Sequence, residues 1–178
     1  RTKNEMFESE KNQNGTLINT SNFGILKSPI DNDVDIIWTK AYIFQRADDN
    51  FDPKLHVWYH FDQKTEILKG IKYYWGLYNP SLNPSRNRRK IEQLTKQANR
   101  FFEKYFLLQS QLEDLYGKPV KVKLLADDED SFIKSIYWED NEKIICLSIR
   151  FDRKIKEIPL IGILNDPHIE ILATFKYN

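Results

Sequence analysis

The stretch HVWYHF, residues 56–61, is the first place where side chains suited to metal chemistry gather. His56 and His60 stand four positions apart with Trp58 between them, a spacing that could chelate zinc on a helix. The β-branched and aromatic residues in this stretch favour a strand instead, where the three side chains share a face and residues four apart lie roughly 13 Å from each other. Each ligand of a zinc ion sits only about 2 Å from the metal. We therefore predict no metal site, and an amphipathic face with Trp58 under a helix or at a rim.

Two acidic clusters begin like calcium loops but lack essential residues. DNDVD, residues 31–35, has Ile36 where the loop needs glycine and Tyr42 where it needs a bidentate glutamate. DDED, residues 127–130, lacks the same glycine and indicates a solvated turn between strands. Neither cluster predicts a dedicated calcium site.

Cys146 is the single cysteine, which excludes an intrachain disulfide and a zinc site built from several cysteines. A nucleophilic cysteine needs a histidine partner in an accessible, electropositive setting. Histidines occur at 56, 60 and 168, and no local motif joins any of them to Cys146. We predict a buried thiol that acts as a small apolar side chain.

The motifs of the common enzyme classes do not occur in the sequence. Its six glycines never cluster, so the glycine-rich nucleotide loops are absent, as are the serine-hydrolase and zinc-peptidase motifs. We predict no cofactor and no catalytic residue. Carboxylates such as Glu139, Asp140 and Glu170 are scattered, and a pair assembled from distant strands, as in glycosidases, stays open.

Four cations in RNRRK break a local rule, because they fall where a helix is expected to begin. Positive charge at a helix N-terminus opposes the macrodipole and costs roughly 0.3–1 kcal/mol per residue at an exposed site. This cluster therefore predicts a binding site for a phosphate-bearing ligand, an acidic protein or a headgroup surface. The alternative is a solvated cluster paired with acids of neighbouring loops. The four residues are Arg86, Arg88, Arg89 and Lys90.

An aromatic segment, residues 66–78, supplies the second candidate binding surface. In a strand, Tyr73 and Trp75 share one face, while Tyr74 and Tyr78 share the other. We expect one set to be core beneath the helix. The other set, together with Trp58, would then form an aromatic surface suited to a protein or a carbohydrate.

Composition limits the class of protein. The 178 residues carry a net charge of +1, which does not favour nucleic acid as a partner. No apolar run is long enough to span a membrane. The polar opening is typical of a tether after a cleaved secretion or lipoprotein signal. It predicts a tail at residues 1–22, an extracytoplasmic location (periplasmic or cell surface), and is consistent with a lipid anchor upstream of Arg1.

The elements that position these residues fit a single α+β domain over residues 23–178. A helix with one apolar stripe is expected from Ser85, as N-cap, to Gly117. The order β-β-β-α-β-β-β-β predicts a mostly antiparallel sheet of about six to seven strands packed against this long helix. The expected strands lie at 34–45, 54–62, 66–78, 120–125, 131–138, 143–151 and 168–177, and the segment 158–164 is apolar and short.

Function is not readable from these residues beyond a choice of classes. We favour a non-enzymatic binding or interaction domain of an exported or lipid-anchored bacterial protein, with an unidentified protein or small ligand as its partner. The alternatives are a motif-poor hydrolase that uses scattered carboxylates and an inhibitor or immunity-type protein. A cleft with two facing carboxylates would favour the hydrolase. The sequence does not fix the oligomeric state.

Overall fold

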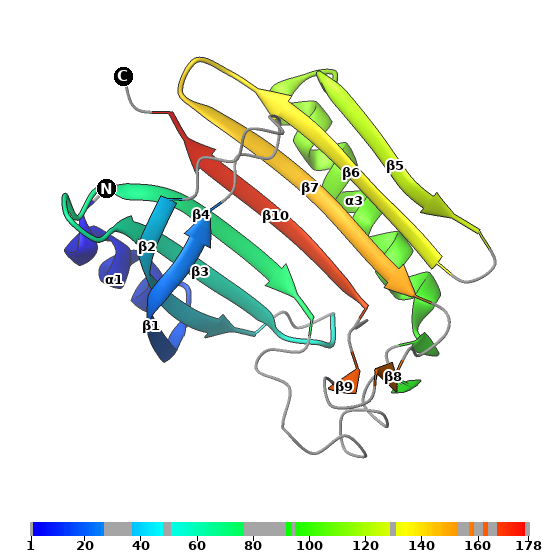
Figure 1. Ribbon diagram of the computed structural model, residues 1–178, viewed down its shortest axis with the longest axis horizontal. Coiled ribbons are helices and arrows are strands. Elements are labelled where there is room, and N and C mark those ends of the chain that lie inside the picture. Colours follow the sequence, from blue (N-terminus) through cyan, green and yellow to red (C-terminus); the bar gives the residue numbers. More distant parts are fainter. Residues whose placement is uncertain are drawn as a thin grey trace.

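A computed structural model describes most of the chain as one sheet with two helices (Figure 1). The described residues are 2–26, 37–47, 51–76, 92–93, 95–128, 131–152, 157–158, 162–163 and 167–176. The elements are α1 (Lys3–Asn12), β1 (Thr16–Leu26), β2 (Ile37–Arg46), β3 (Leu55–Asp62), β4 (Leu68–Trp75), α3 (Ala98–Tyr116), β5 (Lys121–Asp127), β6 (Ser131–Glu139), β7 (Lys143–Asp152), β8 (Glu157–Ile158), β9 (Gly162–Ile163) and β10 (His168–Phe175).

The main sheet has eight strands in the order β1-β2-β3-β4-β10-β7-β6-β5, and each neighbouring pair is antiparallel. The α+β class and the antiparallel sheet predicted from the sequence are thus confirmed, with eight strands in place of six to seven. β8 and β9 form a separate two-stranded sheet. The late strand β10 lies in the middle, where it joins the meander β1–β4 to the meander β5–β7.

Both helices pack on the same face of the sheet but over different halves. Tyr59 pairs with Ile71, Ile71 with Ala173, and Ala173 with Ile145, so these four side chains share a face. Tyr59 and Ile71 belong to the core cluster that contains Met6 of α1, whereas Ile145 belongs to the cluster built around α3. Figure 1 shows α3 running along β6 and β7, and α1 beside the other end of the sheet. The opposite face carries the alternate side chains of every strand.

Residues 1–22, predicted as a polar tail, instead contain α1 and part of β1. Thr2 and Glu5 form a capping box that satisfies the first turn of α1. The buried side chains of α1 are only Met6 and Glu10, which is too little apolar surface to produce a visible stripe. β1 is an edge strand that is rich in Thr, Ser and Asn, so its sequence also looks like a loop.

The long helix is shorter than its apolar stripe predicted. Residues 92, 93 and 95 are helical, and a turn at 96–97 separates them from α3. Gly117 ends α3 as predicted, and its amide donates to the Glu113 carbonyl over 2.8 Å. Phe101, Tyr105 and Leu112 of the stripe are buried. The proposed N-cap, Ser85, lies outside the described residues.

Candidate functional site

His56, Trp58 and His60 lie on the face of the sheet that α1 and α3 do not cover. Along β3 they alternate with Val57 and Tyr59, which face α1. The prediction that His56, Trp58 and His60 share a face is therefore confirmed. The expectation that Trp58 lies under a helix is wrong, because the side chains of β3 that face α1 are those of Val57 and Tyr59. Trp58 stacks on His60 with ring centroids 6.1 Å apart, and Lys72 Nζ lies 4.6 Å from the Trp58 ring centroid.

His60 is held as a neutral ring inside this face. It is 2% exposed, and its Nδ1 lies 3.0 Å from Thr39 Oγ1. Burial, followed by the nearby charge of Lys72, lowers the pKa of His60 to about 3. Among the described residues, His, Cys, Asp and Glu side chains form no group of three that could hold a metal ion.

Cys146 is buried on the same face, where it pairs in register with Tyr137 and Leu172. Burial raises the pKa of this thiol to about 12. A nucleophilic cysteine needs a depressed pKa and access to solvent. The thiol therefore has the inert, apolar character that the sequence predicted.

Of the other predicted binding residues, Trp58 and Tyr74 lie on the same helix-free face, because His56 pairs with Tyr74 and Trp58 with Lys72 on neighbouring strands. Trp58 and Tyr74 are both half-buried, and Tyr74 lies 5.3 Å from the His168 ring between centroids. The remaining predicted site residues, Tyr78, Arg86, Arg88, Arg89 and Lys90, lie outside the described residues, as does the acidic cluster 31–35. At the second acidic cluster, Asp128 accepts bonds from the Ser131 amide and hydroxyl, which fits the predicted turn.

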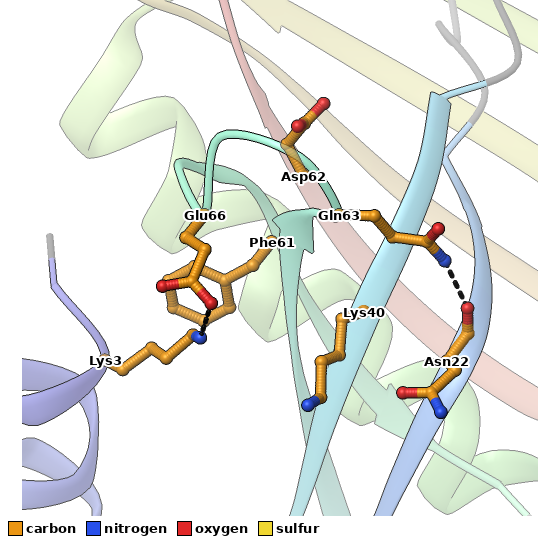
Figure 2. A pocket seen from close by; sticks show the side chains of 7 residues that line it. All are labelled: Lys3, Asn22, Lys40, Phe61, Asp62, Gln63 and Glu66. Carbon is orange, nitrogen blue, oxygen red and sulfur yellow. Dashed lines mark hydrogen bonds and ion pairs between the residues drawn. The ribbon is translucent and has the colours of Figure 1, made fainter.

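A small polar pocket of about 310 Å³ lies where α1, β1, β2 and the β3–β4 turn meet (Figure 2). Figure 2 shows Lys3 reaching from α1 to Glu66, and Gln63 reaching the Asn22 carbonyl oxygen. Asp62 Oδ1 accepts from the amides of Lys64 and Thr65 over 2.9 and 2.8 Å. Both carboxylates therefore serve to close the turn and to tie it to α1.

A larger apolar groove of about 630 Å³ lies on the helix-covered face, between the half of the sheet under α1 and the half under α3. Its floor is the middle of the sheet, and its wall is one side of α3. The lining side chains are Leu55, Leu68, Ile71, Tyr73, Trp75, Leu108, Leu112, Tyr116, Lys143, Ile145, Ile171, Ala173 and Phe175. Leu68, Ile71 and Trp75 of β4 are buried in the two helix cores, whereas the side chains between these cores are half-buried. These half-buried side chains are Tyr73 of β4 and Ile171, Ala173 and Phe175 of β10.

Lys143 and Tyr116 supply polar groups at one end of the groove. Lys143 Nζ lies 5.4 Å from the Tyr116 ring centroid and 3.1 Å from Asp140 Oδ2. The bond to Asp140 raises the pKa of Lys143, so the ammonium stays charged. Asp140 does not depend on this lysine, because its Oδ1 accepts from the amides of Glu142 and Lys143 over 2.8 Å each. Among the described residues that line the groove, Lys143 is the one with a charged side chain.

Sequence reasoning missed this groove, although one signal for it was present. The alternation of Ile169, Ile171, Ala173 and Phe175 predicted a half-buried strand, and β10 has that character. The sequence did not show that β10 lies between the half of the sheet under α1 and the half under α3. The groove exists because α1 and α3 pack on one face without meeting, and α1 was not predicted.

Comparison of the chain with protein-family models, curated proteins and solved structures gave no match. The helices of the described residues include none whose length and apolar character would let it cross a bilayer.

Proposed function

We propose that the protein is a non-enzymatic binding domain for an elongated apolar small molecule with an anionic head, such as a fatty acid or a related acyl compound. The observation that carries this proposal is the 630 Å³ groove, whose described lining is apolar apart from Lys143, the Tyr hydroxyls and the indole nitrogen of Trp75. Ligand sites typically occupy about 300–1,000 Å³ and combine apolar walls with a few polar groups that fix orientation.

The shape of the groove supports an elongated ligand. From Ile171 to Phe175 the floor follows one strand for four steps, roughly 13 Å at the usual rise. Ala173, the smallest lining side chain, lies midway along this floor and leaves room above the sheet. An extended chain lying parallel to β10 would contact β4 on one side and α3 on the other.

The charge at the end of the groove supports an anionic head. Lys143 and Asp140 form an ion pair at the surface, with side chains 22% and 41% exposed, and surface pairs contribute little to stability. Asp140 keeps its backbone donors when the ammonium turns away. A carboxylate or phosphate on the ligand can therefore bind Lys143 in place of Asp140 at low cost, with the Tyr116 ring nearby.

The alternative of a hydrolase has less support from the described residues. Asp62 and Glu66 are the two carboxylates that line the polar pocket. Hydrogen bonds from the Thr65 and Lys64 amides lower the pKa of Asp62, and the bond from Lys3 lowers that of Glu66. A general acid in a glycosidase needs a raised pKa, so this pair lacks the proton donor.

A displacement titration tests the proposal. Anilinonaphthalene sulfonate, an apolar dye with an anionic group, is bound first, and dodecanoate and dodecanol are then added as competitors of equal chain length. We expect dodecanoate to displace the dye at a lower concentration than dodecanol. In Lys143→Gln this preference should shrink by about tenfold or more, since a hydrogen bond to a charged group contributes about 1.5–3 kcal/mol. Lys118→Gln, an exposed lysine beyond α3, is the matched control.

Two further variants locate the bound chain. Ala173→Phe places a ring in the groove and should abolish dye binding. Leu108→Gln should weaken it, whereas Leu107→Gln, on the adjacent exposed position of α3, should not. Thermal unfolding of each variant confirms that it is folded. Unchanged binding in a folded Ala173→Phe variant, or no displacement by either competitor, would overturn the proposal.

The extracytoplasmic location stays a prediction from the sequence. Fractionation of cells of the source organism, with an antibody against the domain, would test it. Recovery in the cytosolic fraction alone would contradict that prediction without affecting the groove.

A further inference from the structure

The end of the groove far from Lys143 is closed by a contact between α3 and β4. Lys104 stands one turn before Leu108 on α3, in the row of side chains that forms the wall of the groove. Its Nζ lies 5.2 Å from the centroid of the Trp75 ring and 5.8 Å from that of the Phe51 ring. The ammonium therefore joins the helix to the sheet at this end.

The side chains at this end are tightly packed. Trp75 is 5% exposed, and Phe51 packs on Phe101 of α3 with ring centroids 5.1 Å apart. Ile169, which pairs with Trp75, is fully buried and is not among the described residues that line the groove. At the level of Trp75 the floor of the groove is thus covered by packed side chains, and the groove ends there.

The pairing register gives the length of the groove between its two ends. On β10, Phe175 lies opposite Lys143, and Ile169 lies opposite Trp75. These two levels are six strand steps apart, about 20 Å at the usual rise. An extended alkyl chain advances about 1.3 Å per carbon, so a chain of about 14 carbons reaches from one level to the ring at the other.

We propose that Trp75, held in place by Phe51 and Lys104, limits the length of the bound chain. This inference rests on the proposed function: Lys143 holds the anionic head, the chain lies along β10, and its last carbon meets the indole ring. The ligand class is then a straight-chain acyl or alkyl anion of about 14 carbons.

The physical reason is a gain in affinity that ends at the ring. Each methylene that enters the groove leaves water, which strengthens binding by about fourfold. A chain that is too long must leave its extra carbons in water or move Trp75, and moving a side chain of a close-packed core is unfavourable. Affinity should consequently rise with chain length up to about 14 carbons and then level off or fall.

Dye displacement by straight-chain carboxylates from octanoate to octadecanoate tests this inference. In the wild type, the concentration for half displacement should fall about fourfold per added carbon as far as tetradecanoate, and no further. In Trp75→Leu, which keeps the side chain apolar but shortens it, the optimum should move to chains longer by about two or three carbons. Tyr73→Leu, on the same strand and also lining the groove, is the matched control. It should change the affinity for all lengths alike and leave the optimum in place.

A second measurement reports the orientation of the chain in the wild type. Bromine quenches tryptophan fluorescence on contact, so tetradecanoate is brominated either at its last carbon or beside its carboxylate. We expect stronger quenching by the terminal bromide, and loss of this difference in Trp75→Phe. Thermal unfolding shows whether each variant is folded, and the wild-type quenching decides the outcome should Trp75→Leu not fold.

The outcomes separate the length limit from the proposed function. Displacement without an optimum, an optimum that a folded Trp75→Leu variant leaves in place, or equal quenching by the two bromides would overturn the length limit while the groove remains a ligand site. No displacement by any of the carboxylates would overturn the proposed function and the length limit together.

Discussion

Arg46 on β2 and Glu10 on α1 form a buried ion pair, in which Arg46 Nε donates to Glu10 Oε2 over 2.8 Å. Their side chains are 11% and 1% exposed. The Tyr59 hydroxyl donates to Glu10 Oε1 over 2.5 Å, and burial together with this bond raises the pKa of Tyr59, which keeps it a donor. α1 is thus held to the sheet by a charged contact as well as by Met6.

Removing the charge of Glu10 should destabilise the fold strongly. Glu10→Gln leaves the Arg46 guanidinium buried without its counter-charge, and breaking a buried pair in this way costs about 3–5 kcal/mol. Urea unfolding measures the change. Glu66→Gln, which breaks the exposed pair with Lys3, is the control and should change stability far less. Similar losses of stability in both variants would show that the buried pair of Glu10 and Arg46 stabilises the fold no more than the exposed pair of Glu66 and Lys3.

Gly15→Ala should disturb the same contact by a steric route. A Cβ atom on Gly15 would lie 2.1 Å from Glu10 Oε2, so the carboxylate would have to move. We expect a loss of stability similar to that of Glu10→Gln. In the double variant the two losses should not add, since residues that act through one network couple. Additive losses in a urea-based double-mutant cycle would separate Gly15 from the ion pair.

Acid should weaken the fold through His60. The pKa of His60 is lowered to about 3 in the folded chain, whereas an unfolded histidine titrates near 6.5. Between these values the unfolded state binds the extra proton, so stability is full above about pH 6.5 and falls as pH drops toward 3. The slope from this group approaches about 1.4 kcal/mol per pH unit.

A comparison of wild type with His60→Asn isolates this contribution. Urea unfolding between pH 7 and about pH 4 should show a slope shallower in the variant by roughly 1 kcal/mol per pH unit. An NMR titration of the His60 ring in the folded protein gives its pKa directly. A ring that titrates near the ordinary value, or equal slopes in the two proteins, would contradict the prediction.

Gly117→Ala should destabilise the end of α3 without a steric clash. A Cβ atom there would meet nothing within 4 Å, but the backbone has φ 75° and ψ −156°. Side chains disfavour this conformation, which costs of order 1–3 kcal/mol. The loss should appear in urea unfolding, while Ser110→Ala on the exposed side of α3 stays near zero. No loss in Gly117→Ala would mean that the chain relaxes to another turn.

The strands with clear alternation were predicted well, because their pattern reports directly which face is buried. β10 and the hairpin of β6 and β7 are of this kind, and the turn at Asp140 appears where expected. β1 and α1 were missed for the opposite reason. Their stability comes largely from the pairing of β1 with β2 and from the contact of Glu10 with Arg46, and both depend on partners far away in the sequence. The capping box of Thr2 and Glu5 is the one local signal.

The candidate site could be predicted from the sequence less well than the fold. Periodicity correctly divided Tyr73 and Trp75 from Tyr74, and the first pair proved to be on the helix side. It could not show that the strip between two helices stays open, since that depends on how α1 and α3 are placed across the sheet. Lys143 carried no signal either, because its role follows from lying at the end of a groove that only the folded chain contains.

The central position of β10 has a consequence for synthesis on the ribosome. β1–β4 can form a meander as soon as they leave the exit tunnel, and β5–β7 can do so later. The two meanders have no shared strand until β10 is made, since β4 and β7 each pair with it. Until then both inner edges are unpaired and open to aggregation. The sheet therefore closes in a single late step, and a nascent chain that stalls before residue 168 would expose two edges at once.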